Sequence, residues 1–359
     1  MSDIPPVTVK NVVENAASDD TRPNRAARWK WFARLALGLL ILALMLRRGD
    51  ASQVQRALQT VSPLVLAASV LFYWLAQMLS ATKWRLLLQA RGAPLAFSEC
   101  CRLYLLGMFW NLWMPTNIGG DAMRAYAAAP RSGGVAAAAS SILVERLTGF
   151  IALLTIGMIG LTLHATSDLQ RTRELHLLLR VIGVLAVFAI LAVVSRAVAL
   201  RLEVRRPHSG LLRKWANLHR ALDFYASHRR WPALAGALGL SFLFQSAQVV
   251  HNLVLAHVVG LDLPGSVFWW LVPLLAVASL LPLGLGGLGV REAAAVAMLA
   301  GTGVAPEIIV AWSLLWQATI WLASLPGALF VQARKSGTND YPVSGGATSD
   351  DAASKATRS

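Results

Sequence analysis

The chain has 359 residues, of which 56% are hydrophobic and 14% are charged. Soluble domains carry about 25% charged residues, so this composition excludes a soluble globular protein. The net charge of +15 does not imply a nucleic-acid partner, because the basic residues lie in loops beside long apolar segments. That distribution is typical of membrane proteins, whose lysines and arginines stay on the cytoplasmic side near anionic lipids.

Long apolar blocks recur along the chain and predict an all-α polytopic membrane protein. A helix that crosses a bilayer needs roughly 20 residues, and six blocks approach or exceed that length. They are 31–46, 61–81, 136–163, 176–195, 231–260 and 306–333. Two shorter blocks, 103–115 and 267–282, each end at a proline.

The distribution of lysine and arginine predicts the side on which each loop lies. The 196–230 connector holds nine of them, whereas loops 261–266 and 301–305 hold none. The rich segments, and with them both termini, are expected on the cytoplasmic side of the cell inner membrane. Two cytoplasmic ends require an even number of crossings. Six blocks therefore span, and the two short blocks are expected to form re-entrant helical hairpins.

The rest of the chain divides around this membrane domain, which we expect to cover 25–335. The polar tails 1–24 and 336–359 are predicted to be disordered and cytoplasmic. Within the connector, residues 211–225 carry an apolar stripe at helical spacing with basic residues beside it. This pattern fits an interfacial helix on anionic lipid or, alternatively, a cap over the ends of the spans.

Two ten-residue motifs match each other at an offset of 167 residues. "PTNIGGDAMR" (115–124) and "PLGLGGLGVR" (282–291) share the proline, both central glycines and the arginine. The flanking spans fall near the same offset, so 61–164 and 231–334 are predicted to be repeat units of span, hairpin and span. The extra span at 176–195 makes the second unit inverted. Inverted repeats with helices broken at matching positions indicate the central site of a transporter.

Charged residues beside these motifs are the candidate site. A charge at mid-bilayer costs about 2.5–3.5 kcal/mol, so it usually has a partner or a function. In one interpretation the charges only pair with each other, as Asp121 and Arg124 could on one helix face. Glu145 and Arg146 are adjacent, as are Arg291 and Glu292, and each pair is expected to diverge and take its partners from elsewhere. In the other interpretation, glycines open two helices whose N–H groups bind an anion, and an arginine one turn later grips phosphate. The candidate substrate-binding residues are Gly119, Gly120, Asp121, Arg124, Glu145, Arg146, Gly286, Gly287, Arg291 and Glu292.

Several stretches resemble the lysylphosphatidylglycerol synthase transmembrane region, a flippase-like family of membrane proteins. They are "ATKWRLLLQARG", "NLWMPTNIGGDAMRAY", "VERLTG" and "LLPLGLGGLGVREAA", within a resemblance that covers roughly 31–335. Some members fuse this region to a soluble synthase domain and translocate the product lipid. Only a polar tail follows Lys335 here, so the resemblance does not imply synthase activity. It does imply motif positions at Pro115, Gly119, Gly120, Asp121, Arg124, Glu145, Arg146, Pro282, Gly286, Gly287, Gly289 and Glu292.

These observations favour a lipid flippase or transporter that moves a polar, phosphate-bearing lipid between leaflets. Neither H-E-x-x-H, Walker A nor G-x-S-x-G occurs, and no cofactor or metal site is predicted. Membrane phospholipids are the expected partners. Two alternatives stay open: a membrane enzyme acting on a lipid-linked substrate through Asp121 or Glu292, and a non-catalytic scaffold for a separately encoded lipid-modifying enzyme.

Overall fold

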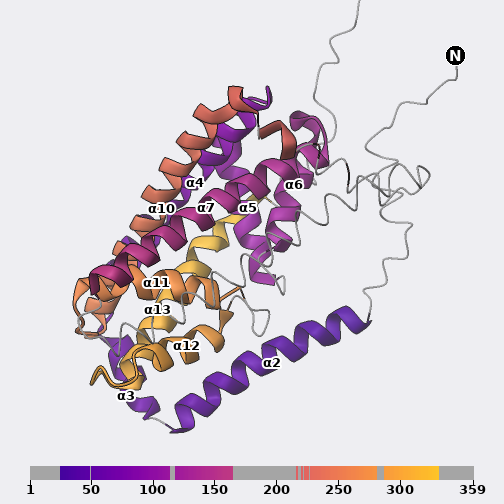
Figure 1. Cartoon of the computed structure of the whole chain (residues 1–359). Coiled ribbons are helices and arrows are strands. Elements are labelled where there is room, and N and C mark those ends of the chain that lie inside the picture. Colours follow the sequence, from indigo (N-terminus) through magenta and orange to yellow (C-terminus); the bar gives the residue numbers. More distant parts are fainter. Residues whose placement is uncertain are drawn as a thin grey trace, which may run out of the picture.

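All secondary structure in the described part of the chain is helical. The computed structural model describes residues 25–48, 50–113, 118–164, 216, 220, 222–225, 227–280 and 287–330 (Figure 1). Four of the described helices are long and apolar enough to cross a membrane. These are α4 (Pro63–Ala90), α7 (Val135–His164), α10 (Trp231–Val258) and α13 (Pro306–Ser324). The predicted all-α membrane class is thereby confirmed.

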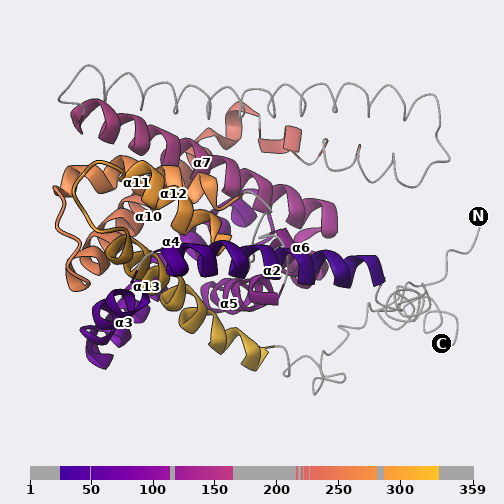
Figure 2. The same cartoon turned by 90° about the horizontal axis from the view of Figure 1, so that it is seen from below.

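The two remaining predicted spans, 31–46 and 176–195, are not among these four helices. Helix α2 (Arg25–Arg48) contains the 31–46 block, but its apolar part, Leu35–Met45, is short. Block 176–195 lies outside the described residues. The count of six spans therefore stays a prediction. Figure 2 shows α2 running along one side of the bundle, where Gly289, just before α12, meets the backbone of Gly38.

Each short apolar block forms a helix that is followed by a second, shorter helix. The block at 103–115 lies in α5 (Phe97–Trp113), and α6 (Ile118–Ser132) follows. The block at 267–282 lies in α11 (Gly265–Ala278), and α12 (Val290–Met298) follows. Helix α3 (Ala51–Gln59) precedes α4, and a 3-10 turn, η1 (His228–Arg230), precedes α10. A second 3-10 turn, η3 (Leu325–Gly327), ends α13.

The order α4-α5-α6-α7 is repeated as α10-α11-α12-α13, with similar local chemistry. Helices α4 and α10 both have 28 residues and a proline in the first turn. Each is followed by a glycine with positive φ, Gly92 at 76° and Gly260 at 77°. The next N–H then donates to a carbonyl five residues back, from Ala93 to Leu88 and from Leu261 to Ala256. This left-handed glycine ending satisfies carbonyls that the helix leaves free.

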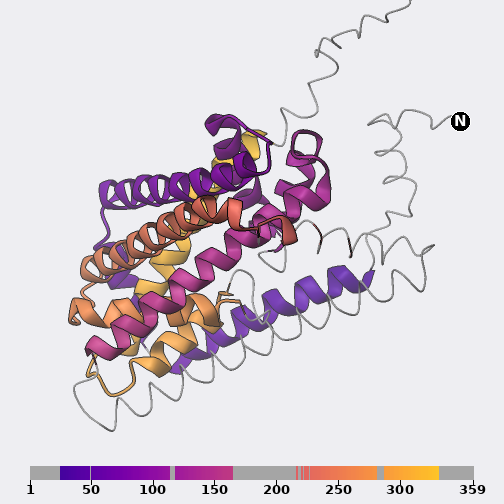
Figure 3. The ribbon, with the colours of Figure 1, turned by 45° about the horizontal axis from the view of Figure 1, so that its top comes forward.

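Contacts between the first helices of the two units show that these helices are antiparallel. Ser69, early in α4, contacts His251, late in α10. Leu86, late in α4, contacts Gly236, early in α10. Helix α10 lies between α4 and α7 (Figure 3). Opposite directions for equivalent helices are what inverted repeats require.

Two glycines at equivalent positions join the units. Gly160 of α7 packs against the backbone of Trp269 in α11, and Gly327 of η3 packs against Leu105 and Phe109 in α5. The two glycines lie 167 residues apart. Each long helix thus packs against the first short helix of the other unit, and a Cβ atom at either glycine would collide with that helix.

The described part of the connector covers helix ends near the predicted cytoplasmic side. Residues 222–225 are helical, and Tyr225 is buried against Leu87, whose carbonyl accepts a hydrogen bond from the phenol at 3.0 Å. Arg91 lies over the rings of Phe224 and Tyr225. These contacts favour the cap over the interfacial helix for 222–225.

Glycine packing between the units generates a first prediction. Gly160→Ala should lower the free energy of unfolding by about 1–3 kcal/mol, the usual cost of overpacking a dense interior. The reason is that a Cβ atom would lie 2.6 Å from the Trp269 carbonyl carbon. Unfolding in mixed micelles, followed by tryptophan fluorescence, measures the effect.

Gly239→Ala in α10 is the matched control, because a Cβ there meets nothing within 4 Å. Alanine is the better helix former by about 0.5–1 kcal/mol, so this variant should be as stable as the wild type or more so. Equal stabilities for the two variants would contradict the proposed close approach of α7 and α11.

Candidate functional site

A cavity of about 700 Å³ lies between the two units and is lined by residues of α2, α4, α5, α6, α7, α10, α11, α12 and α13. Five of the ten candidate residues line it: Asp121, Arg124, Glu145, Arg146 and Arg291. The arginines of both matching motifs therefore face one cavity. Gly119, Gly120, Gly287 and Glu292 are described but are not in its lining. Gly286 lies outside the described residues.

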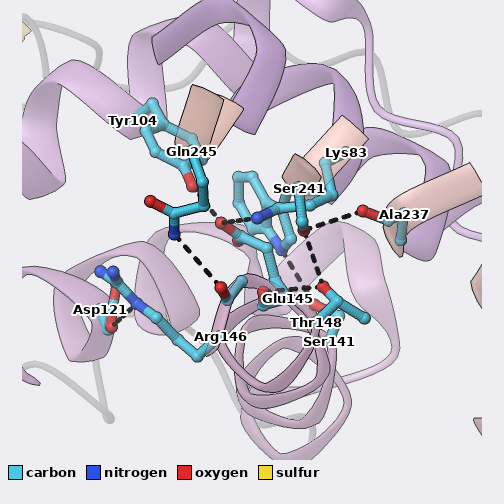
Figure 4. Close-up of polar contacts among 12 residues, drawn as sticks. Lys83, Tyr104, Asp121, Ser141, Glu145, Arg146, Thr148, Ala237, Ser241 and Gln245 are labelled. Carbon is cyan, nitrogen blue, oxygen red and sulfur yellow. Dashed lines mark hydrogen bonds and ion pairs between the residues drawn. The ribbon is translucent and has the colours of Figure 1, made fainter. Parts of the chain in front are cut away.

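The first unit contains a network of ion pairs between α6 and α7 (Figure 4). Arg124 donates to Glu145 at 2.8 Å and to Asp121 at 3.3 Å. Arg146 donates to both oxygens of Asp121 at 2.9 Å. The Asp121–Arg124 pair expected from the sequence is present. Glu145 and Arg146, adjacent in sequence, take different partners, as the sequence also predicts.

Aromatic residues enclose the centre of this network. The Arg124 guanidinium lies 3.8 Å from the ring centroid of Tyr104 and 4.3 Å from that of Trp84. The Tyr104 hydroxyl donates to Glu145. As a result, Arg124 and Glu145 are each only 2% exposed, whereas the Arg146 side chain is 46% exposed. Arg146 is therefore the more accessible guanidinium of this network.

The second unit holds a smaller arrangement of the same kind. Arg291 donates to the hydroxyl and carbonyl oxygens of Ser313 and, at 3.1 Å, to Glu292. Ser313 in turn donates to Glu292 at 2.8 Å. The expectation that Arg291 and Glu292 diverge was wrong. Both side chains bond to Ser313 of α13, and they also bond to each other. The indole of Trp316 lies over the Arg291 guanidinium, 4.7 Å from it.

Near each glycine motif, one glycine N–H already donates to a side chain of the protein. Gly119 and Gly120 lie in the first turn of α6, but the Gly120 N–H donates to the Asn111 side chain at 2.8 Å. Helix α12 begins at Val290, three residues after Gly287, and Glu292 accepts from the Gly289 N–H at 2.6 Å. A carboxylate of the protein thus takes the place that a ligand anion would take at this helix end.

Sequence reasoning missed three residues that line the cavity: Lys83, Tyr104 and Gln245. In the sequence Lys83 lies just beyond the apolar block 61–81, but α4 continues to Ala90 and buries Lys83 to 5% side-chain exposure. The signal was helical spacing, since Lys83 follows the buried residues Ala76 and Ser80 on one face.

The ionisable groups around the cavity in the first unit, counted in their charged forms, do not balance. Lys83, Arg124 and Arg146 face two carboxylates, Asp121 and Glu145, so one positive charge is in excess. In the second unit, Arg291 and Glu292 balance. Buried charges are normally paired, and an excess cation beside a cavity favours an anionic ligand.

Long apolar helices in two antiparallel units, around a cavity lined by ion pairs, define a polytopic helical membrane protein with a charged interior site. Residues 31–327 match the family described as the lysylphosphatidylglycerol synthase TM region, and the chain belongs to this family. It is also similar to a UPF0104 membrane protein of Methanothermobacter thermautotrophicus. The two are 23% identical over an alignment 335 residues long, which covers 86% of this chain and 93% of the relative. No solved structure matches.

The buried network generates a second prediction. Glu145→Gln should lower the free energy of unfolding by about 3–5 kcal/mol, the usual cost of leaving a buried charge without its partner. The reason is that Arg124, at 2% exposure, would lose its closest carboxylate. Denaturant titration in mixed micelles measures this change.

Glu99→Gln is the control for the loss of an acidic charge. Glu99 pairs with Arg102 and Arg131, whose side chains are about half exposed. Ion pairs of that exposure are worth about 0–1 kcal/mol, so stability should change little. A comparable loss in both variants would show that burial does not strengthen the Arg124–Glu145 pair.

Proposed function

We propose that this protein moves a phosphate-bearing lipid between the two leaflets of a membrane. The observation that carries the proposal is a cavity between the units, with one excess positive charge and the arginines of both motifs in its lining. Membership of a family defined by a lipid synthase's membrane region is consistent with a lipid-related role.

The composition of the cavity lining supports a lipid over a soluble anion. Charged groups lie beside α6 and α7, whereas Leu35 and Leu39 of α2 and Trp321 of α13 make other parts of the lining apolar. Leu39 and Trp321 are also exposed on the protein surface, where lipid chains would lie. A headgroup could therefore enter the polar part while its acyl chains stay along these apolar residues.

Arg146 is suited to make the first contact with the phosphate. It is the more exposed of the arginines in the first-unit network and already presents a forked pair of donors to Asp121. A phosphate could take over these two donors, because guanidinium groups bind phosphate and carboxylate in the same geometry. Arg124 and Arg291, each 2% exposed, would contact the headgroup only after the units move apart.

The topology belongs to the same proposal. We place both termini on the cytoplasmic side of the cell inner membrane, and α5–α6 and α11–α12 as re-entrant hairpins within repeat units 61–164 and 231–334. Antiparallel α4 and α10 support this arrangement, since inverted units would reach the cavity from opposite faces.

Leaflet exchange in reconstituted vesicles generates the third prediction. The wild type should speed exchange of a fluorescent anionic phospholipid relative to protein-free vesicles, and Arg146→Gln should slow it by about tenfold, as expected for losing one charge-assisted donor pair. Arg56→Gln is the control, because Arg56 lies on α3 with its side chain 67% exposed and outside the cavity.

Mass spectrometry of the recovered lipids tests the enzyme alternative in the same vesicles. Transport leaves every lipid mass unchanged, so a new lipid product that requires the protein would favour the enzyme. Exchange no faster than in protein-free vesicles, with and without an imposed proton gradient, would contradict the proposed transport.

A further inference from the structure

Lys83 is the cation that leaves the first unit with an excess positive charge. Its ammonium group lies 4.0 Å from Glu145, which is longer than a hydrogen bond. Both oxygens of Glu145 are already used, one by Tyr104 and the other by Arg124. Without Lys83, Arg124 and Arg146 would balance Asp121 and Glu145. An uncompensated ammonium group inside a membrane protein is costly, so Lys83 requires another explanation.

The space beside Lys83 has the features of an anion-binding subsite. A Cβ atom on Gly149 would lie 3.7 Å from the Lys83 ammonium nitrogen and 4.0 Å from the Gln245 amide nitrogen, so both nitrogens border one space that has no side chain. One N–H of Gln245 donates to the Gly149 carbonyl, and its amide has a second N–H. Lys83, Gly149 and Gln245 all line the cavity. Figure 4 shows Lys83 and Gln245 on either side of the Glu145 network.

The second unit fills the equivalent space with a side chain. Gly160 and Gly327 set the register of α7 and α13 at an offset of 167 residues, and in this register Trp316 corresponds to Gly149. The Trp316 indole covers Arg291. Helices α4 and α10, each 28 residues long, begin 168 residues apart, so Lys83 corresponds to His251, which bonds to Ser69 and does not line the cavity. The subsite combines Lys83 and Gly149 of the first unit with Gln245 of the second, and the equivalent positions His251 and Trp316 do not form a matching subsite.

We propose that Lys83 and Gln245, in the space left open by Gly149, bind the phosphate of the transported lipid. This inference rests on the proposed function and deepens it by naming the subsite. The ammonium group supplies the compensating charge and the Gln245 amide supplies a second donor. Loading the subsite with a phosphate monoanion would neutralise the first unit, which accounts for a buried lysine whose nearest carboxylate, Glu145 at 4.0 Å, already bonds to Tyr104 and Arg124.

A binding measurement on the full-length purified protein tests the proposal. The probe is dihexanoylphosphatidylglycerol, with uncharged dihexanoylglycerol and inorganic phosphate as comparison arms, and the readouts are Kd and ligand-induced thermal stabilisation. Lys83→Met should weaken phosphatidylglycerol binding by about tenfold or more, whereas Lys83→Arg, which keeps the charge, should retain most of it. Dihexanoylglycerol should bind weakly to every variant.

Stability without ligand separates this role from a structural one. Lys83→Met removes the excess charge, so the ligand-free protein should unfold at the same temperature as the wild type or higher. If Lys83 instead served as a structural partner of Glu145, Lys83→Met would unfold at lower temperature and bind the lipid normally, and that result would overturn the proposal.

Filling the space provides an independent variant. Gly149→Leu should weaken lipid binding by about tenfold, because its side chain would occupy the position next to Lys83. Gly239→Leu, where nothing lies within 4 Å of an added Cβ, is the matched control and should bind normally. Unchanged binding in Gly149→Leu and Lys83→Met would refute the subsite.

The remaining outcomes separate the subsite from transport. Lipid binding that depends on Lys83, together with leaflet exchange no faster than in protein-free vesicles, would support the subsite and contradict the transport function. Binding of inorganic phosphate in preference to the lipid would support a phosphate subsite but contradict its assignment to a lipid headgroup. Exchange that persists in Lys83→Met with unaltered affinity would contradict the subsite alone.

Discussion

The ion pair between Arg124 and Glu145 is the interaction on which the rest of the site depends. It joins α6 to α7 at 2.8 Å and is almost wholly removed from solvent. Neither charge could stay buried alone, so each needs the other, and the remaining donors and acceptors must be used as well. Tyr104 from α5 donates a hydrogen bond to Glu145, and the ring faces of Tyr104 and of Trp84 from α4 cover the Arg124 guanidinium, whose Nε has no hydrogen-bond partner among the described residues. Four helices of the first unit are thereby fixed around one guanidinium.

The second unit solves the same problem with fewer charges. Arg291 and Glu292 lie on one helix turn, and Ser313 satisfies both from α13. Glu292 also accepts the N–H of Gly289, which stabilises the start of α12. A buried arginine that is satisfied within its own unit adds no net charge to the cavity. The chemistry that could hold an anion is thus concentrated on the side of α4, α6 and α7.

The sequence predicted the class of fold, because apolar length alone distinguishes spanning helices from the rest. It also predicted the paired helices and the approach of both arginines to one cavity, through the repeated Pro, Gly-Gly and Arg spacing. It could not predict that Arg291 and Glu292 share Ser313, since Ser313 lies on another helix, 22 and 21 residues further along the chain. Lys83 was missed for a different reason. A segment defined by hydropathy ends near its first charged residue, whereas a helix continues until its hydrogen bonding ends, here at Arg91 and Gly92.

Glycine has two distinct uses in this architecture, and the difference bears on function. At Gly160 and Gly327 it allows helices of opposite units to approach closely, and these positions are equivalent in the two halves. At Gly149 it leaves space beside a lysine, and the other half has Trp316 instead. The packing that relates the halves is therefore symmetric, while the chemistry of the cavity is not. In the proposed transport, a symmetric frame would allow the two units to exchange conformations at similar free energy, as alternating access requires. A single asymmetric subsite, with Lys83 on the first unit and Gln245 on the second, would hold one headgroup while the access changes around it.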